Sequence, residues 1–500
     1  MNSVVIAAGR TDRLLIGGQW CAPLIATEPA DVHDPSTGRV IGQVPVGGAA
    51  DVDRAVAAAK DAGRQWSMTA PEFRAALLDE VAQRIADRID EFASAITAEM
   101  GAPLDNARDV QTQLAIDVFR SYAGIAREFV WEQPLRAGIV RHEPIGVVAA
   151  ITPWNYPLYL ASIKIAAALA AGCTVVFKPS LDAPLDAFLL TQTIVEVARD
   201  MGAPTGIVNL VSGRGTVVGE AISTHPGIAA VSFTGSTAAG RRVSAAASAT
   251  IKRVGLELGG KSAAIVLDDG VDLETALSGA LANVYYNSGQ TCTACARILV
   301  PHCRYDDAVA IAEQITRRWT IGDPRLPGEH IGPIATRSQY ESVIEYLNSG
   351  VAEGAQLVAG GLPDADQVPD HLRAGNWVLP TLFADVRPGM TIEREEIFGP
   401  VALLMAYADE TDAVRMANDS IYGLSGAVWG ADHERVLDVA RGLETGRVVI
   451  NGGPFDVLAP TGGYKQSGNG RELGVHGLLE FLEVKSLLMP LTGGQMGPRS

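Results

Sequence analysis

Short apolar runs alternate with helical runs along most of the chain. From Asp51 to about Met100 apolar residues recur every three or four positions, which predicts surface helices, the second of them opened by Pro71. Asp51 itself is placed to cap the first helix. From Val147 onward, β-rich segments such as VVAAIT, TVVFK and AVSFT are separated by helical segments. This rhythm is typical of a mostly parallel, doubly wound α/β sheet.

A second alternating stretch begins at AAIVLDD (residues 263–269), continues through ARILV (296–300) and runs to about Asn451. It predicts a second α/β domain. Two further segments, Gly138 to His142 and the closing LLEFLEVKSLLMP, form strands without obvious neighbours in either domain. Unpaired strands of this kind often join subunits.

Composition narrows the class of protein. The chain has 500 residues, of which 47% are hydrophobic and 19% charged, as expected for a globular protein of several domains. Its formal charge is 40 − 57 = −17, and no basic run is present, so we expect neither nucleic acid nor an anionic membrane as partner. No apolar run reaches the roughly 20 residues of a membrane span. The N-terminus lacks the basic start of a secretory signal, so we expect a cytoplasmic protein.

Three residues are candidates for catalysis. Cys292 lies in the polar segment NSGQTCTAC, where it is either a nucleophile or an inert buried thiol. Glu257 in LELGGK is a carboxylate among apolar residues and glycines, and desolvation would raise its pKa toward the range of a general base. Asn155 in TPWNYP is an oxyanion donor or a turn cap. Cys295 completes a CxxC without a second pair, so no metal is expected.

Two segments could bind a nucleotide. FTGSTAAG, with Gly235, links a predicted strand to a helix whose free N–H groups could bind phosphate, although its spacing is not GxGxxG and such a turn can be empty. Lys178 ends the strand in TVVFKPS, where it either contacts a ligand at the sheet edge or is solvated.

The order of these segments resembles the aldehyde dehydrogenase superfamily over nearly the whole chain. The matching motifs are TPWNYP (152–157), KPS (178–180), FTGS (233–236), LELGGK (256–261), GQTC (289–292), EEIFGP (395–400) and GGYKQSGNGRELG (462–474). The resemblance implies a hydrolytic, NAD(P)-dependent enzyme that oxidises an aldehyde to a carboxylate. Cys292 would attack the aldehyde, Asn155 and the Cys292 N–H would hold the oxyanion, and Glu257 would activate the water that hydrolyses the thioester.

The resemblance also implies the cofactor contacts. Lys178 and Glu396 would contact the riboses, Phe398 would pack near the nicotinamide, and Gly235 with Ser236 would lie by the pyrophosphate. The full set of expected cofactor-binding residues is Thr152, Pro153, Trp154, Lys178, Ser180, Gly215, Gly235, Ser236, Glu396 and Phe398.

Three positions depart from the family pattern. Leu181 stands where many members carry the glutamate that binds the adenosine ribose, although Asp182 could substitute, so NAD is expected and NADP is possible. Thr461 replaces an aromatic residue of the substrate tunnel, and Ile163 replaces a tryptophan, while Tyr156 keeps its ring beside Asn155. A wider or differently shaped tunnel is expected.

By the same resemblance the cofactor-binding domain comprises residues 1–123 and 145–257, the catalytic domain 258–455, and an oligomerisation element 124–144 and 472–490. The hairpin at 124–144 would pair with a neighbouring subunit's strand near 478–490 and form a homodimer or homotetramer.

Other activities would use the same residues. An acylating enzyme that transfers the acyl group to coenzyme A would not need Glu257. A silent family member acting as a binding or structural protein would not need the three catalytic positions filled, and a thiol esterase would act without nucleotide.

Overall fold

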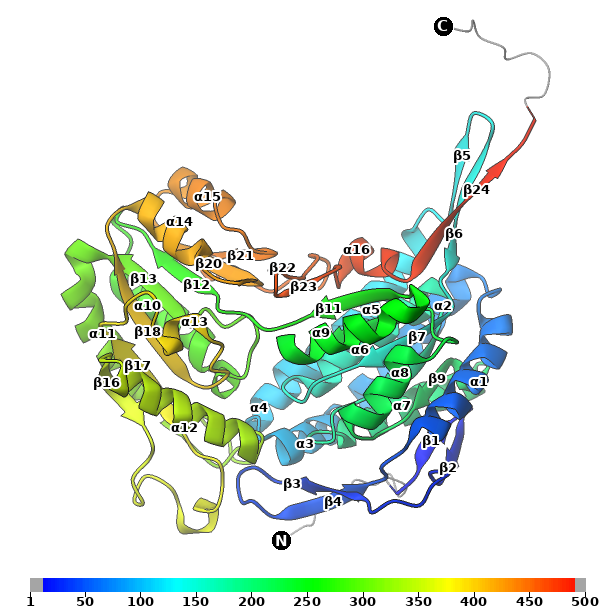
Figure 1. Cartoon of the computed structure of the whole chain (residues 1–500), viewed down its shortest axis with the longest axis horizontal. Helices are drawn as coiled ribbons and strands as arrows, with labels where there is room; N and C mark the ends of the chain where they lie inside the picture. The colour runs from blue at the N-terminus through cyan, green and yellow to red at the C-terminus, as the bar shows by residue number, and fades with distance from the viewer. Residues whose placement is uncertain (1–11, 491–500) are drawn as a thin grey trace, which may run out of the picture.

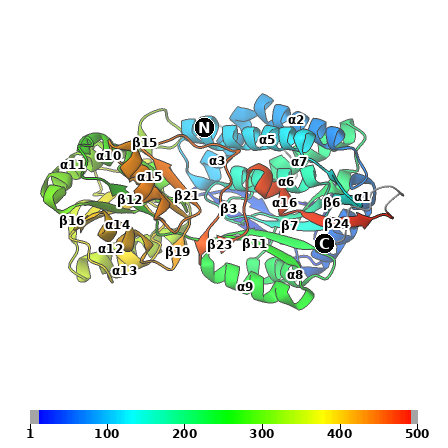
Figure 2. The ribbon, with the colours of Figure 1, turned by 90° about the horizontal axis from the view of Figure 1, so that it is seen from above.

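The chain folds into two lobes and a projecting arm. A computed structural model describes residues 12–490 and contains two large β-sheets, one in each lobe, with helices on both sheet faces (Figures 1 and 2). The predicted doubly wound domain, second α/β domain and small β element are all present. The fold class is therefore confirmed.

The first sheet has eight strands. In spatial order they are β2 (Gln19–Cys21), β1 (Leu14–Ile16), β9 (Val208–Leu210), β8 (Thr174–Lys178), β7 (Val147–Ile151), β10 (Ala230–Thr234), β11 (Arg253–Glu257) and β23 (Gly468–Asn469). The strands from β9 to β11 run parallel. β9, β8, β7 and β10 are buried along their whole length because helices cover both faces, whereas β11 is mostly half-buried. The chain passes from β7 to β8 and β9 on one side and then resumes at β10 on the other. The point between β7 and β10 is thus the topological switch point, where doubly wound folds bind ligands.

Helices of the first lobe follow the predicted pattern. They are α1 (Ala49–Trp66), α2 (Pro71–Asp87), α3 (Ile89–Met100), α4 (Leu104–Asn106), α5 (Gln113–Glu128), α6 (Pro157–Ala171), α7 (Leu185–Asp200), α8 (Glu220–Thr224) and α9 (Thr237–Ala247), with π-helical turns at Ala107–Thr112 and Gly215–Gly219. Pro71 opens α2 as expected. Asp51 is not the cap residue of α1, because Gly48 occupies that position, but its Oδ2 accepts a hydrogen bond from the Gly48 N–H at 3.0 Å.

The second sheet has seven strands. In spatial order they are β16 (Gln356–Gly361), β17 (Leu379–Ala384), β18 (Val401–Tyr407), β13 (Arg297–Pro301), β12 (Ala263–Val266), β20 (Ser425–Trp429) and β21 (Arg447–Ile450). Its helices are α10 (Leu273–Tyr285), α11 (Tyr305–Arg318), α12 (Arg337–Ala352), α13 (Thr391–Arg394), α14 (Glu410–Asn418) and α15 (His433–Arg441). Small two-stranded ladders pair β3 (Ala30–His33) with β4 (Val40–Val44), β14 (Thr320–Ile321) with β15 (His330–Ile331), and β19 (Tyr422–Gly423) with β22 (Tyr464–Lys465).

The two sheets are joined by residues 258–262, which run directly from the carboxyl end of β11 to the amino end of β12. The carboxyl edge of the first sheet therefore faces the amino edge of the second, as the extended course of β11 toward the second lobe shows in Figure 1. Loops that precede β13 and β18 lie at that amino edge. This junction brings the predicted catalytic and cofactor residues of both lobes to one place.

The projecting arm is a three-stranded antiparallel sheet of β24 (Leu482–Leu488), β6 (Gly138–Pro144) and β5 (Glu132–Leu135) (Figure 1). The predicted pairing with a neighbouring subunit's strand is corrected here, because β24 pairs along its whole length with β6 of the same chain. The boundary at 124 is also corrected, since α5 continues to Glu128. In the predicted C-terminal part of the element, α16 (Gly474–Leu479) packs on α5 and α6 of the first lobe.

Within residues 12–490, no helix has the length and apolar character needed to cross a membrane. The prediction about the N-terminal segment rests largely on residues outside the described range.

Two buried carboxyl groups, those of Glu99 on α3 and Asp186 on α7, lie at the N-terminus of α7. The Glu99 oxygens accept hydrogen bonds from the N–H groups of Leu185 (2.6 Å) and Asp186 (3.0 Å), which lack partners within the helix. Neither oxygen of the buried Asp186 carboxyl has a hydrogen-bond partner among the described residues. Burial raises the pKa of both groups, that of Asp186 to about 7. Ionising the pair fully therefore destabilises the first lobe.

We predict that Asp186→Asn flattens the pH dependence of stability. Because the folded pKa is raised, the stabilising contribution is present below about pH 4 and is lost as the pH rises through about 7. The free energy of unfolding of the wild type, relative to Asp186→Asn, should fall by roughly 2–4 kcal/mol between pH 4 and pH 8 in denaturant titrations. Asp366→Asn, at an exposed position, is the matched control. Parallel pH profiles for wild type and Asp186→Asn would contradict the prediction.

Candidate active site

Cys292 lies in a strained turn between α10 and β13. Asn287 and Ser288 adopt positive φ angles of 52° and 56°, and Gly289 has a φ of 72°. A Cβ on Gly289 would stand 1.9 Å from the Gly399 carbonyl oxygen, so only glycine fits there. Such backbone conformations persist only where surrounding contacts hold them.

Hydrogen bonds from the first lobe hold this turn. Asn155 donates from Nδ2 to the Gln290 carbonyl at 3.0 Å, and Asn287 donates from Nδ2 to the Asn155 carbonyl at 3.0 Å. Gln290 in turn accepts at Oε1 from the Ala335 N–H at 2.8 Å. Asn155 is 3% exposed, so its amide is fixed beside the cysteine turn. Asn287 and Gln290 were not among the predicted site residues.

The Cys292 thiol is partly accessible but lies among protein groups that disfavour its ionisation. Burial, reinforced by the negative charges of Glu396 and Glu257, raises the pKa of Cys292 to about 12, while the positive charge of Arg447 acts in the opposite direction. Burial also raises the pKa of Cys295 to about 12. The five cysteines are all free thiols. Cys292 is therefore protonated at neutral pH in this state and needs a base before it can act as a nucleophile.

Glu257 ends β11 and lines a pocket formed by the first lobe and residues 469–481. Its carbonyl accepts from the Gly235 N–H at 3.0 Å, which ties it to the FTGS loop. Its buried Oε1 has no hydrogen-bond partner among residues 12–490. Burial and the negative charge of Glu472 raise the pKa of Glu257 well above its ordinary value, and the charges of Lys164 and Arg471 oppose this shift. A carboxylate whose pKa is raised in this way is suited to accept a proton.

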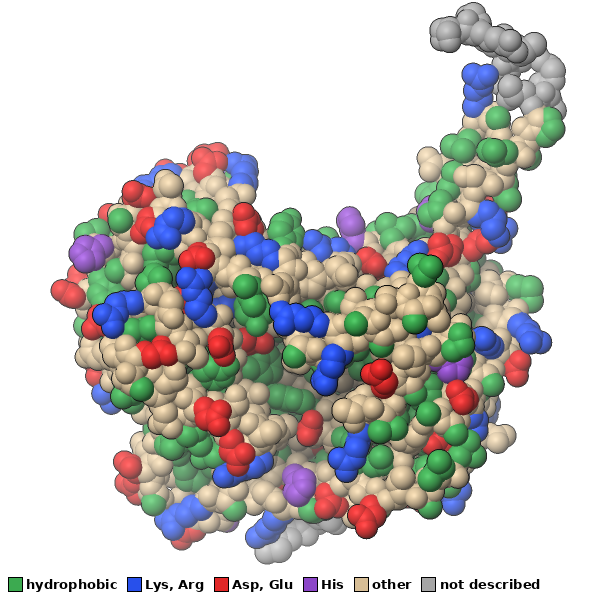
Figure 3. Space-filling model, in the orientation of Figure 1, with side chains coloured by type: hydrophobic (Ala, Val, Ile, Leu, Met, Phe, Trp, Pro, Cys, Tyr) green, Lys and Arg blue, Asp and Glu red, His purple; other side chains and the backbone are tan. Residues whose placement is uncertain are grey.

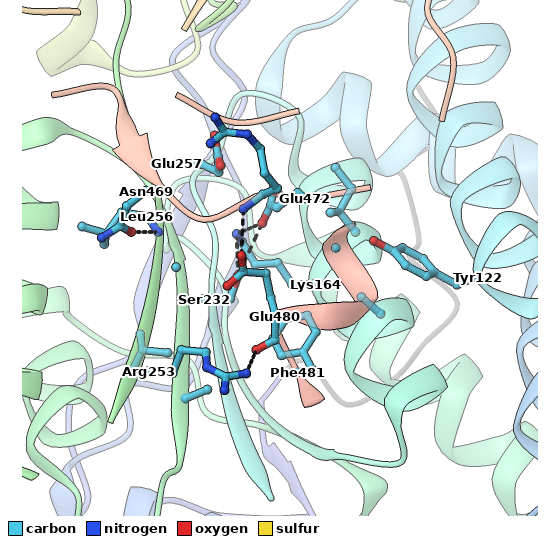
Figure 4. Close-up of a pocket in the computed structure, with 17 residues that line it drawn as sticks. Tyr122, Lys164, Ser232, Arg253, Leu256, Glu257, Asn469, Glu472, Glu480 and Phe481 are labelled. Atoms are coloured by element: carbon cyan, nitrogen blue, oxygen red, sulfur yellow. Dashed lines mark hydrogen bonds and ion pairs between the residues drawn. The ribbon is translucent and has the colours of Figure 1, made fainter. Parts of the chain in front are cut away.

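An ion pair lies behind Glu257 in the same pocket (Figure 4). Lys164 Nζ lies 2.5 Å from Glu472 Oε1 and donates to Ser232 Oγ at 3.0 Å. Lys164 is fully buried on α6. Lys164 was not among the predicted site residues. The available signal was a lysine inside an otherwise apolar segment, because a buried lysine requires a partner.

The carboxyl ends of β7 and β8 bring four of the expected cofactor residues together. Thr152, Pro153 and Trp154 follow β7, and Lys178 ends β8. The Thr152 N–H donates to the Lys178 carbonyl at 3.1 Å. The buried Lys178 ammonium donates to the Pro179 carbonyl at 3.0 Å, and burial lowers its pKa to about 8. Two of its three N–H donors thus remain for another acceptor.

Three more of the expected residues lie along the same sheet edge. Gly235 and Ser236 follow β10 across the switch point, and Ser236 caps α9 by accepting from the Ala239 N–H at 3.3 Å. Ser180 lies just beyond Lys178. Gly215 is exposed at the start of the π-helical turn that follows β9, so it lies farther from the switch point, on the other side of β8.

Glu396 and Phe398 reach this edge from the second lobe. Glu396 Oε1 accepts from the Gly260 N–H at 2.9 Å, and burial raises the pKa of Glu396 to about 7 against the effects of that N–H and of Lys261. Phe398 packs edge-on against Trp154 with ring centroids 5.5 Å apart. The two lobes thus meet across this contact. Figure 3 shows a hollow between the lobes on this face of the molecule.

The structure shows what surrounds each position that departs from the family pattern. Leu181 packs against the core of the first lobe, whereas Asp182 is exposed and accepts from Ser180 Oγ at 2.9 Å. Ile163 is buried and lines the pocket of Lys164 and Glu257. Thr461 lines a different cavity, together with Cys295.

A metal site is not expected from these side chains. Among the described residues, no group of three or more His, Cys, Asp or Glu side chains could hold a metal ion.

Comparison with known proteins identifies the family. A model of the aldehyde dehydrogenase family matches residues 24–487. The chain belongs to the aldehyde dehydrogenase family. It is 47% identical over 474 residues to 3-succinoylsemialdehyde-pyridine dehydrogenase of a Pseudomonas species, covering 95% of this chain and 97% of that protein. The predicted family and enzyme class are confirmed.

Solved structures agree with this assignment. A mutant of aldehyde dehydrogenase C from Pseudomonas syringae, crystallised with NAD+ and octanal, superposes with a TM-score of 0.93 at 42% identity, covering 98% of this chain and 99% of that one. A Mycobacterium tuberculosis aldehyde dehydrogenase complexed with NAD+ has a TM-score of 0.92 at 40% identity, covering 97% and 99%.

We predict that Gly259→Ala weakens nucleotide binding. A Cβ at this position would stand 2.2 Å from Glu396 Oε2 and would displace that carboxylate. Losing one hydrogen bond from a charged group should raise the KM for nucleotide by about 10- to 100-fold. Gly124→Ala is the control, because a Cβ there meets open space on α5. An unchanged KM with normal thermal stability would contradict the prediction.

Proposed function

We propose that the protein oxidises an aldehyde to a carboxylate, with Cys292 as nucleophile and NAD as hydride acceptor. The single observation that carries this proposal is the pair of hydrogen bonds between Asn155 and the turn that contains Cys292. Glu257 lies opposite this turn, and the switch point of the first sheet lies beside it. The first lobe, with residues up to Glu257, would bind the nucleotide, and the second lobe from residue 258 would supply the nucleophile.

The residues at the sheet edge suit a dinucleotide. Ribose hydroxyls both donate and accept, and the buried Lys178 ammonium and Glu396 carboxylate offer one group of each kind. Ser236 and Gly235 stand at the N-terminus of α9, where N–H groups favour phosphate. The bound nucleotide would accept a hydride at its nicotinamide ring. Relatives crystallised with NAD+ support NAD as the cofactor. Leu181 leaves NADP possible.

The reaction proceeds in two halves. The Cys292 proton goes to a base, and its sulfur forms a bond to the aldehyde carbon while the carbonyl oxygen takes up the electron pair. The Asn155 amide and the Cys292 N–H hold this oxyanion. The oxyanion re-forms the carbonyl as the carbon loses hydride, which leaves a thioester. Glu257 then removes a proton from water, the hydroxide adds to the thioester, and the thiolate leaves with release of the carboxylic acid.

Two charged side chains lie close to Glu257. Lys164 and Glu472 form a buried ion pair in the pocket that Glu257 lines. Their charges act on the pKa of Glu257 in opposite directions. We assign Lys164 and Glu472 as positioning residues whose charges set the electrostatic surroundings of Glu257.

The presence of Glu257 favours hydrolysis over acyl transfer to coenzyme A. A thiol acceptor is nucleophilic enough to need no carboxylate, whereas water does need one. The Pseudomonas relative is named as acting on a semialdehyde that carries a pyridine ring. A substituted aldehyde with a polar group away from its reacting carbon is accordingly the first substrate class to test.

The arm favours a homodimer or homotetramer. Its three-stranded sheet leaves apolar side chains uncovered, because Val484 is 63% exposed and Leu488 is 79% exposed on β24. A second copy of the chain would cover these side chains. We expect light scattering to give a multiple of 52.5 kDa, and the double variant Val484→Asp, Leu488→Asp to shift the protein toward monomer. A wild-type monomer across working concentrations would contradict this assignment.

We predict that Glu257→Gln retains the first half-reaction and loses the second. Because glutamine cannot accept a proton from water, rapid mixing with aldehyde and NAD should give a burst of about one reduced nucleotide per subunit, followed by turnover slowed about 100- to 10,000-fold. Cys292→Ala should abolish both phases. A Glu257→Gln enzyme with wild-type turnover would rule out Glu257 as the base. Repeating the wild-type assay with NADP compares the two nucleotides directly.

A further inference from the structure

The second lobe contains a cavity of about 490 Å³ beside the cysteine turn. It is lined by β21, by α10 and by the loop that precedes β22, and Thr293 and Cys295 of the cysteine turn contribute to its wall. Thr461 also lines it, where a bulkier side chain would reduce the space. The cavity therefore adjoins the reacting thiol but extends away from it.

Aromatic rings connect this cavity to the catalytic turn. The Tyr156 hydroxyl lies 2.9 Å from Thr291 Oγ1, next to Cys292. Tyr156 packs against Tyr159, and Tyr159 packs edge-on against Phe455, with ring centroids 6.5 Å and 6.1 Å apart. Phe455 lines the cavity. The rings form one wall that leads from the thiol to the cavity.

Arg447, the first residue of β21, also lines this cavity. Its guanidinium carbon lies 5.4 Å from the centre of the Phe455 ring. Its buried Nε has no hydrogen-bond partner, and no ion pair to Arg447 occurs among residues 12–490. The acidic residue that lines the same cavity, Asp456, accepts at Oδ1 from the Leu458 N–H at 2.8 Å and is thereby directed to its own loop.

Arg447 is half-buried, but its Nε is a buried N–H donor, and such a donor is costly to leave unbonded unless a ligand supplies an acceptor. The positive charge of Arg447 reaches the reacting thiol, because it lowers the pKa of Cys292 against the effect of burial. The guanidinium and the nucleophile thus lie within electrostatic reach, joined by an aromatic wall. A substrate whose aldehyde carbon meets Cys292 would direct its other end along this wall toward Arg447.

We propose that Arg447 determines substrate specificity by binding an oxygen acceptor, a carboxylate or a ketone carbonyl, at the far end of the aldehyde. This assignment rests on the proposed function and adds the substrate class to it. Thr461 leaves the space that such a substituent occupies. Unsubstituted alkanals reach Cys292 but leave the guanidinium without an acceptor.

The test compares three aldehydes of similar length: succinic semialdehyde, 4-oxopentanal and pentanal. The wild type should have a higher kcat/KM for at least one oxygen-bearing aldehyde than for pentanal. The aldehyde with the higher kcat/KM identifies the acceptor as a carboxylate or a ketone. Arg447→Met should reduce that ratio about 10- to 100-fold. Arg447→Lys should restore part of it for a carboxylate.

The ratio of kcat/KM values separates recognition of the substrate by Arg447 from an effect of Arg447 on the Cys292 thiol. Removing the Arg447 charge also changes the ionisation of Cys292, but that effect acts equally on all three substrates and cancels in the ratio. An equal loss for all three aldehydes in Arg447→Met, or no wild-type preference over pentanal, would overturn the assignment of Arg447. Wild-type enzyme that oxidises none of the three, while binding NAD, would instead count against the proposed function.

Discussion

The paired hydrogen bonds between Asn155 and the turn of residues 287–290 are the contact on which the active site depends. One runs from the Asn155 side chain to the second lobe, and the other returns from Asn287 to the Asn155 backbone. They hold three consecutive residues with positive φ angles, a conformation that isolated chains rarely adopt. The contact thus joins the lobes, orients the amide that would hold the oxyanion and positions the thiol in a single arrangement.

Burial sets the chemistry of the groups around this contact. Desolvation raises the pKa values of Cys292, Glu257 and Glu396, so these groups ionise less readily than they would in water. Lys164 and Arg471 oppose this effect at Glu257, and Arg447 opposes it at Cys292. The cations thus limit the rise in pKa that burial causes. Gly259 and Gly260 allow this crowding, because side chains there would meet Glu396 or the Cys292 carbonyl.

Much of this arrangement could be predicted from the sequence. The strand rhythm predicted both sheets, since buried parallel strands are continuous apolar runs, and seven motifs in order predicted the family. Lys164 was missed because the sequence does not show which distant residue a lysine in an apolar segment pairs with, and its partner Glu472 lies far away along the chain. Arg447 was missed because a single arginine at the start of a strand carries no pattern. The pairing of β24 was misjudged because strand propensity does not specify whether the partner belongs to the same chain. Ile163 lines the pocket behind Glu257, and its place in the substrate tunnel stays a prediction.

The direct connection of β11 to β12 has a consequence for how the enzyme handles water. Only residues 258–262 connect β11 to β12. The Glu257–Gly235 hydrogen bond fixes the start of this connection, and the Gly260–Glu396 hydrogen bond fixes its middle. Such a short, bonded crossing gives little room for the hinge motion by which many enzymes close over a substrate. In the proposed reaction, water would therefore reach the thioester through local rearrangements of side chains and of the nucleotide rather than through a hinge motion of the two lobes.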